Sequence, residues 1–146
     1  MKVKILSILV MIAASLLLLS CITSKLINVE ISCDQFNQNP NAKSEFTVEI
    51  GDKITITLCS NPTTGYQWDY EIVGEDTLME EDHDFQEPED EELMGAPGKD
   101  IWTFEATDVG TAEIRMEYSR SFESSEQAEW TYVVYVTVQE YIEPSE

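Results

Sequence analysis

One ten-residue stretch, Cys-Ser-Asn-Pro-Thr-Thr-Gly-Tyr-Gln-Trp, combines residue types suited to binding another molecule through a rigid loop. Pro62 fixes its own φ at about −65°, and Gly65 can adopt a positive φ where the chain turns. Thr63 and Thr64 are stiff at χ1 and carry hydroxyl groups, and we expect Asn61 to close an Asx turn. Such a loop loses little entropy on docking. The same residues also suit an ordinary connection between strands, so both interpretations remain open here.

Two further polar segments offer chemistry of the same kind. The first is rich in glycine and proline, which lets a peptide partner approach its backbone closely. The second projects an arginine and an aromatic ring from a long loop before the last expected strand. In a Greek-key sandwich, loops of this order meet at one end, so three loops would form one binding edge. The two segments are Gly95-Ala96-Pro97-Gly98 and Arg120-Ser121-Phe122.

No set of residues with catalytic or metal-binding spacing stands out. His83, the single histidine, lies among acids, and we expect it to be solvated. The acidic run 80–92 lacks the regular spacing of an EF-hand calcium loop. A zinc site is disfavoured because the chain has no Cys-x-x-Cys pair and no second histidine. We therefore predict that the protein is not an enzyme and has no cofactor or metal.

The N-terminus has the pattern of an export signal. Lys2 and Lys4 precede an apolar run over 5–19, and Leu-Leu-Ser leads to Cys21. This ending resembles a bacterial or archaeal lipobox, in which the cysteine is lipidated; an uncleaved membrane anchor is the alternative. We expect an extracytoplasmic protein, lipid-anchored at the cell membrane through Cys21 or secreted, with no other membrane contact.

The other two cysteines, Cys33 and Cys59, form a possible disulfide, because such bonds persist outside the cytoplasm. The alternation of the strands argues against it. Cys33 shares a face with the apolar residues before it, whereas Cys59 lies opposite its apolar neighbours. A bulge or a strand end between them would reconcile the two faces, so the pairing stays open.

The chain is strongly acidic, with a net charge of −21 that becomes −23 once residues 1–20 are removed. Nucleic acid is excluded as a partner because phosphate contacts need clustered lysine and arginine. The charge is spread widely, which favours a role in solubility over steering toward a basic partner. We expect a monomer.

Apolar and polar residues alternate with a period of two along most of the mature chain, which predicts β-strands. About seven such strands with short turns predict an all-β, immunoglobulin-like antiparallel sandwich. The tryptophans at 68, 102 and 130 are in strand phase, so we expect them in the core. Two stretches break the pattern. We expect 34–43 to be a polar connector and the acidic insertion, about 75–92, to be disordered or a solvated loop.

Residues 44–140 resemble the chagasin-type inhibitors of papain-like cysteine peptidases, proteinase inhibitor family I42. The sequence Asn-Pro-Thr-Thr-Gly-Tyr (61–66) is similar to the first inhibitory loop of that family. Gly-Ala-Pro-Gly (95–98) resembles its glycine-rich second loop, and Arg-Ser-Phe (120–122) stands where the family usually has Arg-Pro-Trp. The export signal and this resemblance together divide the chain into a lipoprotein signal peptide (1–20), a lipidated N-terminus with the first strand and connector (21–43), and a chagasin-like domain (44–142).

The resemblance implies a reversible protein inhibitor of papain-like (clan CA, family C1) cysteine peptidases that blocks the active-site cleft with three loops. Residues 61–65 would sit nearest the catalytic cysteine and histidine, with Thr63 closest to the thiolate, and Tyr66 would also bind the peptidase. Residues 95–98 would lie along the substrate-recognition side, and Arg120, Ser121 and Phe122 on the opposite side. Ser121 and Phe122 depart from the family pattern and predict a less rigid third loop. The alternative is an immunoglobulin-like surface adhesion or binding module without inhibitory activity.

Overall fold

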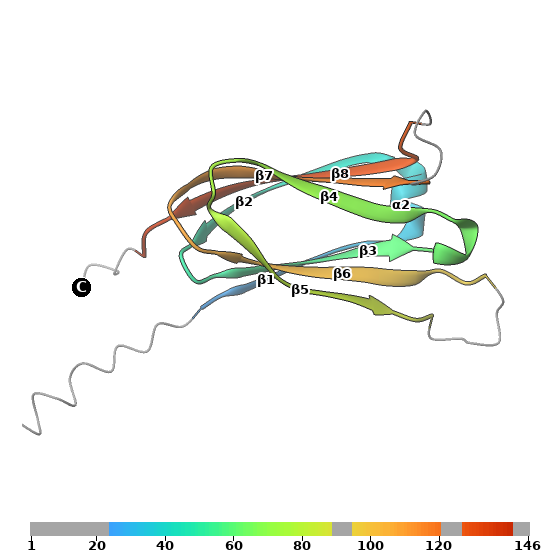
Figure 1. Cartoon of the computed structure of the whole chain (residues 1–146), viewed down its shortest axis with the longest axis horizontal. Helices are drawn as coiled ribbons and strands as arrows, with labels where there is room; N and C mark the ends of the chain where they lie inside the picture. The colour runs from blue at the N-terminus through green and yellow to red at the C-terminus, as the bar shows by residue number, and fades with distance from the viewer. Residues whose placement is uncertain (1–23, 89–94, 121–126, 142–146) are drawn as a thin grey trace, which may run out of the picture.

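The computed structural model describes residues 24–88, 95–120 and 127–141, which form two four-stranded β-sheets packed face to face (Figure 1). The strand orders are β1-β3-β6-β5 and β2-β8-β7-β4. This arrangement confirms the predicted all-β sandwich. The elements are β1 (Leu26–Ile31), α2 (Cys33–Gln38), β2 (Asn41–Glu49), β3 (Lys53–Ser60), η1 (Pro62–Thr64), β4 (Gln67–Gly74), β5 (Leu78–Gln86), β6 (Gly98–Ala106), β7 (Gly110–Ser119) and β8 (Trp130–Gln139).

The sheets are not antiparallel throughout, which corrects one part of the prediction. Four strand pairs are antiparallel, but β1 pairs with β3 and β2 pairs with β8 in parallel. The reason is the connection through α2, which carries the chain from one sheet to the other between β1 and β2. Each of these two strands therefore pairs with a strand that is not joined to it by a hairpin.

The apolar faces of the strands meet between the sheets, as the alternation predicts. Trp68 and Trp102 are buried, and Trp130 is partly buried and packs against the core. The buried side chains that were predicted from alternation are Ile54, Ile56, Leu58, Trp68, Trp102, Phe104, Ala106, Ala112, Ile114, Met116, Tyr118, Tyr132, Val134, Val136 and Val138.

The expectation of a disordered or solvated loop is wrong for Leu78–Gln86, which form the edge strand β5. This strand pairs with β6 through backbone hydrogen bonds, with a register shift between Glu80 and Asp82. Its acidic side chains are exposed, and charge on an edge strand discourages pairing with other chains. Composition alone suggested disorder because the backbone pairing that stabilises β5 does not depend on apolar side chains.

His83 is exposed, as expected, and it also contacts two other residues. Its side chain is 43% exposed, but Nε2 lies 3.0 Å from a carboxylate oxygen of Asp100. The imidazole also stacks on the indole of Trp102, with ring centroids 4.3 Å apart. Nearby, the Tyr70 hydroxyl on β4 donates to the carboxylate of Glu80 on β5 and so joins the edges of the two sheets. Burial and this hydrogen bond raise the pKa of Tyr70 to about 12.

Within the expected connector 34–43, the chain instead forms the short helix α2. Ser32 caps it: the Gln35 backbone N–H donates to Ser32 Oγ, and the Ser32 N–H donates to the Gln35 side chain. This reciprocal pair is a capping box. Phe36, a residue of this helix, has a fully buried side chain. The prediction failed because a single apolar residue within polar neighbours shows no helical periodicity.

Cys33 and Cys59 form a disulfide with their Cα atoms 5.2 Å apart. The alternation of apolar residues had placed Cys33 and Cys59 on different strand faces. The strand no longer fixes the direction of Cys33, because β1 ends at Ile31 and Cys33 is the first residue of α2. Cys59, near the end of β3, is buried together with both of its neighbours. The bond thus ties α2 to the strand that leads into the 61–65 loop.

Replacing both Cys33 and Cys59 with serine should lower the free energy of unfolding by about 3 kcal/mol, because the open chain gains the entropy of a 26-residue loop. Urea unfolding followed by tryptophan fluorescence measures this change. A reductant should destabilise the wild type by a similar amount and leave the double variant unchanged. An equal effect of reductant on both proteins would contradict the prediction.

Candidate functional site

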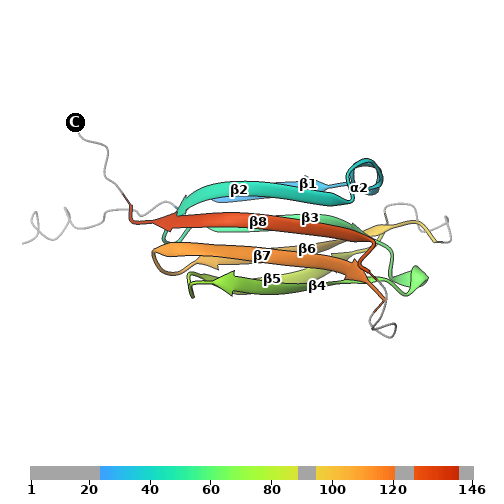
Figure 2. The ribbon, with the colours of Figure 1, turned by 90° about the horizontal axis from the view of Figure 1, so that it is seen from above.

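The strands that flank the three loops singled out by sequence begin or end at one end of the sandwich (Figures 1 and 2). The strand registers show this directly, because Ser60 at the end of β3 is opposite Gly98 at the start of β6. In the other sheet, Gln67 at the start of β4 is opposite Ser119 at the end of β7. We call this end of the sandwich the loop end. Ser121 and Phe122 of the third loop lie outside the described residues.

The first loop forms a single 3₁₀ turn, η1, coloured green at the right of Figure 1. Gly65 closes it with a φ of 82°, as expected for the residue at which the chain turns. The backbone N–H groups of Thr64 and Gly65 donate to the carbonyls of Asn61 and Pro62, each at 3.1 Å. The side chains of residues 62–64 are exposed, so the turn presents them to solvent.

Both threonine hydroxyls are used to stiffen this turn. Thr63 Oγ1 donates to the side-chain oxygen of Asn61 at 2.6 Å, and Thr64 Oγ1 donates to the Asn61 backbone carbonyl at 2.6 Å. The Asn61 side chain makes no capping bond to a backbone N–H. The expectation of an Asx turn is therefore wrong: the Asn61 side-chain oxygen accepts from the Thr63 hydroxyl instead.

Asn61 joins the first loop to its neighbours. Its side-chain Nδ2 donates to the backbone carbonyl of Gly95 in the second loop at 2.8 Å. Its backbone N–H donates to the hydroxyl of Tyr118 on β7 at 2.8 Å. On the other side, the guanidinium of Arg120 lies over the ring of Tyr66, 4.6 Å from its centroid. The first loop is thus held from both sides by the segments that carry the other two.

Removal of the Tyr118 hydroxyl by Tyr118→Phe should weaken binding by this loop. The ring would remain, but the half-buried Asn61 N–H would lose its acceptor, at a cost of about 1–3 kcal/mol shared between stability and loop order. We expect the dissociation constant for a bound peptidase to rise about fivefold. Surface plasmon resonance measures this change, and Tyr132→Phe, which loses a hydroxyl bonded to Ser44 away from the loops, is the matched control.

The second loop depends on two glycines. Gly95 has a φ of 84°, which favours glycine. Gly98 is buried, and a Cβ there would lie 2.4 Å from the backbone oxygen of Gln86 and 2.5 Å from the ring of Phe85. Between them, Ala96 is partly buried and Pro97 is exposed. Close approach of β5 and β6 at this point therefore requires glycine at position 98.

A cluster of five aromatic rings supports the loop end from inside. Phe36 stacks on Trp130 with centroids 5.1 Å apart and lies 5.2 Å from Trp68. Tyr118 contacts Trp68, Trp130 and Tyr66 at 5.1, 4.9 and 5.3 Å. The indole N–H of Trp68 donates to the Cys59 carbonyl at 2.9 Å. The strand end that carries the first loop is thereby fixed to the core.

Sequence reasoning missed two residues of this support. Phe36 was assigned to a connector, although the Ser-x-x-Gln pattern at 32–35 is a capping-box signal for a helix start. Tyr118 was predicted to be in the core, but no sequence pattern indicated that its hydroxyl would accept from Asn61. That contact joins residues 57 positions apart.

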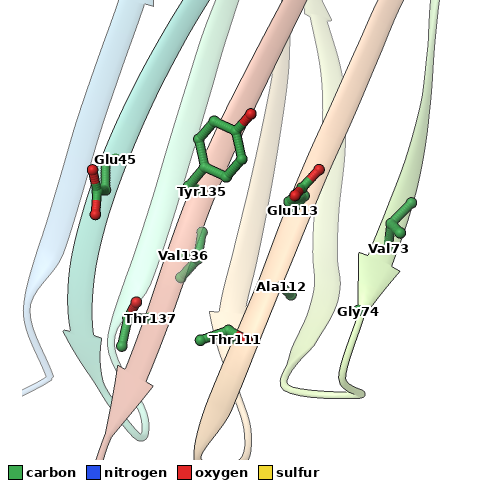
Figure 3. Close-up of a pocket in the computed structure, with 9 residues that line it drawn as sticks. All are labelled: Glu45, Val73, Gly74, Thr111, Ala112, Glu113, Tyr135, Val136 and Thr137. Atoms are coloured by element: carbon green, nitrogen blue, oxygen red, sulfur yellow. The ribbon is translucent and has the colours of Figure 1, made fainter.

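A groove of about 490 Å³ lies elsewhere, on the outer face of the sheet that contains β8 (Figure 3). Glu45, Tyr135 and Glu113 stand side by side across it, in register on β2, β8 and β7. It lies on a sheet face and is not lined by the loop residues. In the part of the chain that the structure describes, no group of three histidine, cysteine or acidic side chains is placed to hold a metal ion. Nor does any helix in these segments have the length and apolar character needed to cross a membrane.

Comparison with known proteins places the chain among peptidase inhibitors. Residues 47–136 match the family model described as chagasin family peptidase inhibitor I42. Amoebiasin-2 of Entamoeba histolytica is 30% identical over 80 residues, which span 55% of this chain and 65% of that protein. Chagasin of Trypanosoma cruzi is 30% identical over 95 residues, spanning 62% of this chain and 84% of chagasin.

Solved structures share the fold. The crystal structure of the cysteine protease inhibitor EhICP2 from Entamoeba histolytica has a TM-score of 0.64 and 22% identity, covering 80% of this chain and all of that one. PbICP-C, in complex with falcipain-2, has a TM-score of 0.57 and 19% identity, with the same coverage. At these identities the likeness supports the sandwich architecture.

Proposed function

This chain belongs to the chagasin family of peptidase inhibitors, family I42, and on that premise we propose that it reversibly blocks the active-site cleft of papain-like cysteine peptidases. The family consists of inhibitors, so the protein is not an enzyme. The observation that supports the proposal most strongly is that Asn61 of the first loop is bonded both to Gly95 of the second loop and to Tyr118, on the strand that leads to the third. Inhibition by this edge is steric and needs no reaction of its own.

The loops divide the contact with the peptidase between them. Thr63 is closest to the catalytic thiolate, at the exposed tip of η1. Residues 95–98 follow the substrate-recognition side with their backbone, and Arg120 lies on the opposite side with Ser121 and Phe122. A narrow 3₁₀ turn closed by Gly65 does not present an extended peptide to the nucleophile, so the loop escapes cleavage.

The protein acts as a monomer, lipid-anchored at Cys21 outside the cytoplasm. The direction of β1 and β3 supports an anchor at the N-terminal end of the sandwich. β1 begins at Leu26, opposite Lys53, whereas η1 follows the far end of β3. An anchor ahead of β1 therefore leaves the loop end directed away from the membrane and accessible to a peptidase.

Titration of papain and a panel of related cysteine peptidases with the purified protein tests the function. We expect stoichiometric, reversible loss of activity at submicromolar to micromolar inhibitor, with full recovery after dilution. A serine peptidase such as trypsin should be unaffected and serves as the control. Full activity of every papain-like enzyme at micromolar inhibitor would instead favour a binding module that uses the loops for another ligand.

A further inference from the structure

Exposed apolar side chains gather at the end of the sandwich opposite the loops. Among the described residues, six large apolar side chains are exposed, and Tyr135 on the face of β8 is the exception to this clustering. Single exposed apolar residues are normal on a protein surface, but their concentration at one end is not. We call the other five the basal surface: Leu26, Ile50, Met79, Val109 and Tyr141, with exposed fractions from 40% to 60%.

The registers and turns place these five at one end. Val109 directly precedes Gly110, which is opposite Val138 near the end of β8, and Tyr141 follows the end of β8. Leu26 and Met79 lie on one row across the first sheet, with Lys53 and Glu105 between them. Ile50 lies in the turn after β2, and its N–H donates to Gln139 at the end of β8 at 3.2 Å. In Figure 1, this end is at the left, where β1 and β7 begin and β2 and β8 finish.

The proposed anchor lies close to this surface in the sequence. Five residue steps separate Cys21 from Leu26, and a fully extended chain covers at most about 18 Å over that length. A lipid held at Cys21 therefore brings the basal surface within about 18 Å of the bilayer interface. So short a tether raises the effective concentration of bilayer at this end far above that at the loop end.

We infer that the basal surface docks on the lipid bilayer itself, which seats the sandwich upright. This inference rests on the lipid anchor of the proposed function. The five apolar side chains enter the interface between headgroups, where apolar area contributes to binding of peripheral proteins. Acids such as Asp108 and Glu140 stand among them, so attraction to anionic lipid is not the source of the contact. Docking in this way adds a second membrane contact to the acyl chains, and so departs from the expectation from sequence that Cys21 makes the only membrane contact.

Upright docking has a consequence for the inhibitor. The eight residues of β3 separate the basal surface from the first loop by about 26 Å. The loop end is then held at a defined height above the bilayer, with the wide faces of both sheets roughly perpendicular to the membrane. A peptidase that approaches from outside meets the loops first.

A tryptophan probe and brominated lipid test the docking. The mature lipidated protein carrying Tyr141→Trp is reconstituted into phosphatidylcholine vesicles with and without bromine on the acyl chains. The fluorescence of the added tryptophan is the difference between the variant and the wild-type protein. We expect brominated lipid to reduce this fluorescence at least about twofold, because the side chain at position 141 contacts the bilayer. Tyr135→Trp, placed on the outer sheet face shown in Figure 3, is the matched control and should show no quenching.

Adding Val109→Asp to the Tyr141→Trp protein separates docking from tethering. Quenching should fall at least about twofold, because the substitution replaces one of the five apolar contacts with a second carboxylate beside Asp108 while the lipid stays attached. Unchanged quenching would overturn the inference, as would equal quenching at 135 and 141, or a mature chain without lipid on Cys21. Papain inhibition by the same vesicles is measured in parallel. Inhibition without quenching overturns the docking alone, whereas loss of inhibition counts against the proposed function.

Discussion

Thr63→Glu is expected to raise the inhibition constant for papain at least about 100-fold, which corresponds to about 2.7 kcal/mol of binding free energy. Thr63 stands at the exposed tip of η1, where the proposed complex brings it nearest to the catalytic thiolate. A longer, negatively charged side chain there would be buried without a partner, which is costly in an interface. The substitution also removes the bond from Thr63 Oγ1 to Asn61.

The folded inhibitor itself should tolerate this substitution. The side chain is exposed and contributes little to the core, so the free energy of unfolding should change by no more than about 0.5 kcal/mol. Thr107→Glu is the matched control, since this exposed threonine lies in the turn between β6 and β7, far from the loops. The inhibition constants of both variants for papain are measured from progress curves. Equal inhibition by the Thr63→Glu and Thr107→Glu proteins would show that the tip has been assigned wrongly.

Phe36→Ala should cause the largest loss of stability, about 3–5 kcal/mol of unfolding free energy. The ring is fully buried and packs against Trp130 and Trp68, so its removal leaves a cavity and ends two aromatic contacts. The disulfide keeps α2 near this position, and relaxation of the helix into the cavity is therefore limited. Urea unfolding at equilibrium measures the effect.

The same variant tests whether the aromatic cluster supports the loops. Under conditions in which the Phe36→Ala protein is still folded, its inhibition constant should rise, because Trp68 also bonds the Cys59 carbonyl just before the first loop. Phe36→Leu fills most of the volume and should retain both stability and inhibition within a small margin. A cost below about 1 kcal/mol for Phe36→Ala would mean that α2 is not part of the core.

The local features of the site were predictable because each depends on a few neighbouring residues. Alternation along a strand decides which side chain faces the core, and it identified Ile54, Trp102 and Val134 correctly. Proline restricts its own φ, threonine restricts its own χ1, and glycine alone readily adopts a positive φ, so the 61–65 loop is a stiff turn closed by Gly65. The resemblance of this loop to one family is confirmed by the match of residues 47–136.

Contacts between distant residues were decided only by the tertiary structure. β5 forms because its backbone groups pair with those of β6. The acidic composition of this segment does not reveal that a neighbouring strand is available for pairing. The parallel pairing of β1 with β3 and of β2 with β8 depends on how α2 carries the chain from one sheet to the other. Asn61 and Tyr118 meet because β3, in one sheet, and β7, in the other, finish at the same end of the sandwich. A sequence determines local conformation through short-range sterics, whereas these contacts arise from the packing of the whole chain.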